Sequence, residues 1–278
     1  MIHLPLPTAR IADVYPNCAK RTKDTQLRNS LALEEPRVFA RSADYERLAP
    51  ILSLYRLAQE TAIHVTEEEL GNLYERVLVK GGERQTYLAI RSSSPFSRCP
   101  LCAQRDVQTL DHYLPRASFP EFAVLPINLV PSCFECNHAK HEDVPGTAGE
   151  LTFHPYYDDW SEHSLIQARI GFDDSVFAEF SVNVEALPDN VAERAMNHFS
   201  KLDLGTLYSA HASLELVQRK SNFTLIFDSS GPEVLRAEIL RESVSRRRPF
   251  SNAWQPALYQ ALGESDEFIN GGFRAIEA

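Results

Sequence analysis

Two Cys-x-x-Cys pairs near the middle of the chain restrict its fold more than any other feature. Cys99 and Cys102 form the first pair, Cys133 and Cys136 form the second, and thirty residues separate them. Each pair brings two thiolates close enough to share an ion, and two pairs complete a tetrahedral zinc site. Because all four ligands would come from the protein, the zinc is expected to be structural. The alternative, buried cysteines without a ligand, would make the paired spacing coincidental. The long separation predicts a folded insertion.

The insertion and its end carry polar residues suited to hydrolytic chemistry. Asp111 and His112 are adjacent, Asn128 follows, and Asn137 comes directly after the second cysteine pair. His112 titrates in the range that a general base needs. If the pair lies on a strand, the two side chains point to opposite faces. Carboxylate and amide oxygens are hard donors, which suit Mg²⁺ or Mn²⁺ better than zinc, so a second metal is expected here.

These residues resemble the HNH endonuclease family of the zinc-stapled type, over roughly residues 95–160. The resemblance implies a ββα-metal fold, in which a strand bears Asp-His and a helix bears the last Asn. In the family pattern, Asp111 and Asn137 bind the divalent ion and His112 is the base. Asn128 corresponds to the residue that braces the loop and so keeps His112 oriented. The family often has His where this chain has Asn137, and Asn suits a single hard cation.

The resemblance also implies a function. A metal-dependent endonuclease that hydrolyses DNA phosphodiester bonds, leaving 5′-phosphate and 3′-hydroxyl ends, is the leading hypothesis; RNA stays open as a substrate. Arg116, Lys140 and His141 are candidate contacts to the substrate phosphate. Stand-alone HNH proteins of this shape resemble nuclease effectors of bacterial anti-phage (antiviral) defence systems, often encoded beside an ATPase. An ATPase or another defence-system subunit is therefore an expected partner, and an oligomer is possible.

The charge of the chain limits how it can hold nucleic acid. It has 28 Lys and Arg against 38 Asp and Glu, a net charge of −10. Proteins that coat nucleic acid are usually basic, because neutralising phosphates supplies most of the affinity. DNA must therefore be bound by a local patch, or a partner must bring it.

The flanks predict an α+β chain, mainly helical, around the central module. We expect an N-terminal, mainly helical region over 1–94, the zinc-stapled module over 95–160, and a hairpin plus helices over 161–278. Residues 1–40 show no sustained period and predict an arm with short elements. Apolar spacings of three and four predict helices over 42–58, from the Thr66 capping box to Gly81-Gly82, over 191–202, over 204–217 and from Pro232 onward. Residues 85–98 predict a linker or an edge segment, and 165–172 with 176–184 predict a hairpin.

Two other functions stay open. A non-catalytic zinc-ribbon adaptor that binds nucleic acid or a protein partner fits the acidic charge and the helical bulk. Thiol redox chemistry at the cysteine pairs is more remote. No apolar run approaches the roughly 18 residues of a membrane-spanning helix. The N-terminal segment is interrupted by prolines and lacks the apolar core of a signal peptide. A cytoplasmic protein that does not contact membranes is expected.

Overall fold

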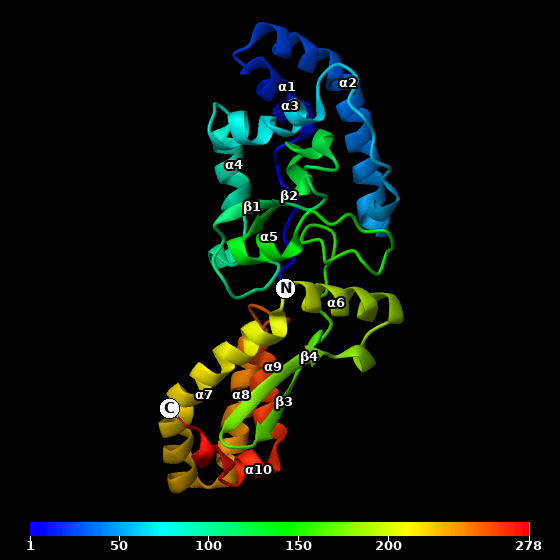
Figure 1. Cartoon of the computed structure of the whole chain (residues 1–278). Coiled ribbons are helices and arrows are strands. Elements are labelled where there is room, and N and C mark those ends of the chain that lie inside the picture. Colours follow the sequence, from blue (N-terminus) through cyan, green and yellow to red (C-terminus); the bar gives the residue numbers. More distant parts are fainter. Residues whose placement is uncertain (278) are drawn as a thin grey trace. The chain divides into compact units, whose positions relative to one another are not determined.

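The computed structural model describes residues 1–277 and divides the chain into two compact units (Figure 1). The N-terminal unit is His3–Asp159, and the C-terminal unit joins Met1–Ile2 to Trp160–Ala278. The domain boundary expected between residues 160 and 161 lies one residue after this division, which separates residues 159 and 160. The boundary expected at 94/95 lies inside the N-terminal unit. The physical reason is that a pair of short strands cannot bury its own apolar side chains, so Leu110 and Leu129 join a core built from the preceding helices.

The N-terminal unit begins with two helices where only an arm was expected. Helix α1 spans Ile11–Lys20 and helix α2 spans Thr25–Leu48. The Asp24 side chain caps α2 by accepting a hydrogen bond from the Leu27 amide. Pro16 and Pro36 lie inside these helices, where each removes one backbone hydrogen bond without ending the helix. The prediction for residues 1–40 was therefore wrong, and the helix expected over 42–58 ends at Leu48.

The next segment contains an unusual helical turn. The Thr66–Glu69 capping box is present and begins helix α3, Glu67–Gly71. Instead of one α-helix, the chain then forms a π-helical segment over Tyr74–Val79. Gly81 follows, but not in the left-handed conformation that its place after a helix indicated. A glycine is needed at position 81 because there is no room for a side chain. A Cβ at this position would lie 2.5 Å from the Arg76 carbonyl oxygen.

The remaining elements of this unit carry the polar residues singled out in the sequence. Helix α4, Arg84–Arg91, replaces the expected linker. Strand β1, Thr109–His112, pairs antiparallel with β2, Leu129–Ser132, and helix α5, Phe134–Lys140, follows directly. Helix α4 packs against both strands (Figure 1). The chain thus forms strand, loop, strand and helix in the expected order.

The C-terminal unit confirms the expected hairpin and helices. Strands β3, Ile166–Phe172, and β4, Val176–Val182, form an antiparallel pair that packs against helices α7 and α9. Its helices are α6 Asp189–Lys201, α7 Leu204–Ser230, α8 Pro232–Arg247, α9 Trp254–Glu264 and α10 Asp266–Ile269. The α+β class is confirmed. Within residues 1–277, no helix is long and apolar enough to cross a membrane.

The fold predicts that Gly81 is a stability determinant of the N-terminal unit. We expect Gly81→Ala to lower its free energy of unfolding by about 1–3 kcal/mol, because the new methyl group meets rigid backbone. Urea unfolding followed by circular dichroism measures this. Both tryptophans, Trp160 and Trp254, belong to the C-terminal unit, so their fluorescence transition should not move.

Gly146→Ala is the matched control. A Cβ at that exposed position meets only the Glu150 carboxylate, at 3.5 Å. Equal destabilisation by the two substitutions would contradict the role of close backbone approach at Gly81.

Candidate functional site

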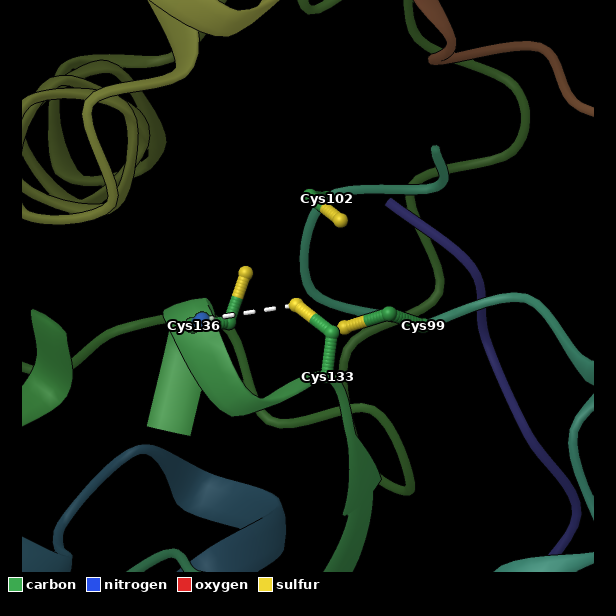
Figure 2. Close-up of side chains that lie close together, drawn as sticks. All are labelled: Cys99, Cys102, Cys133 and Cys136. Atoms are coloured by element: carbon green, nitrogen blue, oxygen red, sulfur yellow. Dashed lines mark hydrogen bonds between the residues drawn. The ribbon is translucent and has the colours of Figure 1, made fainter. Parts of the chain in front are cut away.

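The four paired cysteines converge in the structure. Figure 2 shows Cys99 and Cys102 on the loop before β1, with Cys133 and Cys136 at the start of α5. Their sulfur atoms all lie within 4.8 Å of one another, and all four side chains are buried. A tetrahedral zinc with bonds of about 2.3 Å places its sulfur ligands roughly 3.8 Å apart. The cluster could therefore hold a metal ion after a small contraction.

Hydrogen bonds around the sulfurs also suit a metal site. The amide of Arg105 donates to the Cys102 sulfur at 3.4 Å, and the amide of Cys136 donates to the Cys133 sulfur at 3.3 Å. Such bonds stabilise thiolates. The pKa of the Cys133 and Cys136 thiols is raised, chiefly because each shares its proton with the Cys102 sulfur. A bound cation would replace these protons, so metal affinity should fall in acid.

His112 ends β1 with one ring nitrogen already engaged. Its Nε2 lies 2.9 Å from the Ala123 carbonyl oxygen, which can only accept, so Nε2 carries the proton and Nδ1 is the acceptor. The Tyr74 ring packs against the imidazole with centroids 4.5 Å apart. Burial lowers the pKa of His112 to about 3, and the positive charges of Arg116 and Lys140 act in the same direction. The imidazole is therefore neutral at physiological pH.

Asn128 holds the loop between β1 and β2. Its side chain is fully buried, and its Oδ1 accepts a hydrogen bond of 2.8 Å from the Leu114 amide. Its Nδ2 donates to the carbonyl oxygens of Leu114 at 3.1 Å and Phe122 at 3.3 Å. Ala123, which fixes the His112 ring, directly follows Phe122. These bonds are the kind that the bracing role requires.

Asp111 and Lys140 form a buried ion pair that the sequence did not indicate. The Lys140 Nζ lies 3.0 Å from Asp111 Oδ2 and also donates to the His112 carbonyl oxygen at 2.6 Å. Only 7% of Lys140 is exposed, and its ammonium is engaged by these two partners. Burial raises the pKa of Asp111, although the Lys140 charge opposes this. The Lys140 ammonium thus lies beside both carboxylate oxygens of Asp111, at 3.0 Å from Oδ2 and 3.3 Å from Oδ1.

A pocket of about 650 Å³ collects most of the candidate residues. Asp111, His112, Arg116, Asn137 and His141 line it, whereas Lys140 and Asn128 do not. Its wall also contains residues that sequence reasoning did not assign to the site: Tyr74, Glu75, Val79, Tyr87, Thr109, Leu110, Pro115 and Glu142. Tyr74 was expected only in the core, since its helical spacing gave no signal of a second role.

The pocket contains three kinds of group. The His112 Nδ1 can accept a proton, the Arg116 guanidinium suits an anion, and the side-chain oxygens of Asp111 and Asn137 suit a hard cation. One guanidinium nitrogen of Arg116 is buried in its wall without a hydrogen-bond partner. A phosphate oxygen would satisfy such a group. In the described part of the chain, only the cysteine cluster contains three or more metal-ligating Cys, His, Asp or Glu side chains. An ion beside Asp111 and Asn137 would therefore take its other ligands from water or substrate.

The cysteine cluster predicts one tightly bound zinc per chain, measurable by elemental analysis of the purified protein. We expect Cys136→Ser to lose this zinc and to destabilise the N-terminal unit, because a structural zinc contributes directly to folding. Cys18→Ala is the control, since Cys18 is buried elsewhere in this unit. A metal-free wild type whose unfolding is unchanged by Cys136→Ser would contradict the site.

The ion pair predicts a large cost for removing its cation. Lys140→Met should destabilise the N-terminal unit by about 3–5 kcal/mol, because Asp111 would stay buried without a counter-charge. Urea unfolding followed by circular dichroism measures the loss. Adding Asp111→Asn should restore much of the stability, and a double variant no more stable than Lys140→Met would contradict the coupling.

Comparisons with known proteins give one relative and no family. The chain is 26% identical, over 301 aligned positions, to "Protein ea31" of Escherichia phage lambda; the alignment covers 98% of this chain and 100% of that protein. No model of a known protein family matches the sequence, and no solved structure matches it. The similarity extends across both compact units rather than the central segment alone.

Proposed function

We propose that the protein is a metal-dependent endonuclease of the HNH type that hydrolyses DNA phosphodiester bonds. The observation that carries the proposal is a single pocket lined by His112, Asp111, Asn137 and Arg116. These groups can take a proton, hold a hard cation and bind a phosphate, which are the requirements of phosphodiester hydrolysis. The resemblance noted in the sequence and the strand–strand–helix order both support this reading.

His112 acts as the general base in this proposal. Its Nε2 is committed to the Ala123 carbonyl oxygen, so Nδ1 receives the proton of the attacking water. The loop that carries Ala123 is held by Asn128, which makes Asn128 a positioning residue. The low pKa of His112 keeps it unprotonated but makes it a weak base. A weak base requires a water that is more acidic than bulk water.

A divalent cation is proposed to supply that acidity. Mg²⁺ or Mn²⁺ lowers the pKa of water and neutralises charge that develops on the phosphate. Asp111 and Asn137 would hold it, since both line the pocket and carry hard oxygen donors. Lys140 already neutralises part of the Asp111 charge, which should weaken metal affinity relative to a free carboxylate. Zinc is proposed as the ion of the cysteine cluster.

The substrate phosphate is proposed to contact Arg116, because one of its buried guanidinium nitrogens has no hydrogen-bond partner. His141 lines the same pocket and is a second candidate contact. Control by an ATPase or another anti-phage defence subunit stays a proposal based on the HNH resemblance alone. The name of the phage relative says nothing about activity or partners.

The proposal predicts that His112→Ala lowers the rate of plasmid nicking in Mg²⁺ or Mn²⁺ by roughly 10²–10⁴-fold, the usual contribution of a general base. His64→Ala is the matched control, because His64 lies in the same unit but outside this pocket. Both variants should retain the metal of the cysteine cluster and the circular dichroism spectrum of the folded wild type at the assay temperature. Conversion of supercoiled to nicked plasmid measures the rate.

Two outcomes would contradict the nuclease proposal. Equal cleavage by wild type and His112→Ala would exclude His112 as the base. Absence of cleavage by the metal-loaded wild type, with partner proteins present, would favour the zinc-ribbon adaptor instead. In that case His112→Ala should retain full biological activity.

A further inference from the structure

Helix α4 presents a face with an alternating arginine and tyrosine pattern. Arg84, Tyr87 and Arg91 are spaced by three and four residues, which places them on one side of the helix. The guanidinium carbons of Arg84 and Arg91 each lie 5.8 Å from the centre of the Tyr87 ring. Arg84 is exposed and Arg91 is partly exposed, whereas Tyr87 is buried. The two arginines thus rest on a fixed aromatic platform.

This face is continuous with the pocket of His112. Tyr87 lines the pocket, and its ring meets the Tyr74 ring edge-on at 6.3 Å. Tyr74 in turn contacts the His112 ring, and Arg116 lies over Tyr74 at 5.5 Å. Arg84 also donates to the carbonyl oxygen of Val79, another residue of the pocket wall. Helix α4 lies beside β1 (Figure 1).

The two arginines of this face, and Arg116 of the pocket, lack acidic partners. Among residues 1–277, no carboxylate lies within 4.0 Å of Arg84, Arg91 or Arg116. By contrast, Arg98 and Arg105 nearby in sequence pair with Asp106 and Glu135. In a chain with a net charge of −10, three guanidinium groups without an acidic partner, at or near one pocket, form a local positive surface. The acidic residues of the pocket, Glu75 and Glu142, lie in its wall, and Glu75 is paired with Lys80.

Stacked arginines are suited to bind phosphates. Stacking restricts the side chain while leaving the planar edge of the guanidinium available, and that edge matches two phosphate oxygens. We propose that Arg84 and Arg91 bind the backbone of the DNA strand that enters the His112 pocket. This inference rests on the proposed nuclease function and deepens it. The chain itself then supplies part of the grip on the substrate.

The experiment measures DNA binding without cleavage. A short fluorescein-labelled DNA duplex is titrated with His112→Ala protein in EDTA, and fluorescence anisotropy is followed at several NaCl concentrations. Adding Arg84→Gln and Arg91→Gln should weaken binding roughly tenfold or more at low salt. It should also reduce the slope of log K against log salt by about 2, one for each lost phosphate contact.

The control and rescue variants separate charge from packing. Arg56 lies over the Tyr55 ring at 5.5 Å and is exposed, but it is outside the pocket wall, so Arg56→Gln should leave binding unchanged. Arg84→Lys with Arg91→Lys should keep most of the salt slope, because the charges remain. Binding that is equal in the Arg84→Gln/Arg91→Gln and Arg56→Gln proteins would overturn the inference.

The outcome is independent of the nuclease test. Cleavage that requires His112 together with DNA binding that ignores Arg84 and Arg91 would remove this inference and leave the proposed function. Salt-dependent binding that requires the two arginines in a protein without nuclease activity would do the reverse. Failure of the His112→Ala protein itself to bind the duplex would overturn the DNA-binding surface directly.

Discussion

Helix α5 is held at both ends by buried polar groups, and the candidate site depends on this attachment. Cys133 and Cys136 at its start meet the sulfurs of the preceding loop, and Lys140 at its end reaches back to β1. A seven-residue helix is not stable alone, because helix nucleation costs more than so few hydrogen bonds return. The position of Asn137 in the pocket therefore follows from contacts made on either side of it.

The pocket places positive charge around a neutral imidazole. Burial lowers the pKa of His112 most, and the charges of Arg116 and Lys140 lower it further. The same cations favour an anion in the pocket, so the charges that make the imidazole harder to protonate also make the pocket suited to an anion. Asp111 is the compensating negative charge, buried and paired with Lys140. Proton acceptance and anion binding are thus coupled through the same few charged groups.

The N-terminal helices contribute a wall of the site rather than a separate domain. Tyr74 comes from the π-helical segment and Tyr87 from α4, and both line the pocket. π-Helical turns often occur at functional sites, because the extra residue in the turn redirects a side chain. The capping box and the apolar stripe before Gly81 were predictable from local spacing. The π-helical turn was not, since it depends on how Tyr74 and Val77 pack in the core.

The sequence alone determined the local features of this protein. Pair spacing identified four cysteines that do converge, alternation identified the β3–β4 hairpin, and Pro232 marked the start of α8. Tertiary structure decided what depends on distant residues. It buried Lys140 against Asp111, brought Tyr87 to the pocket of His112, and kept α1 and α2 helical despite their prolines. Spacing records neighbours along the chain, whereas desolvation and packing depend on residues far apart in sequence.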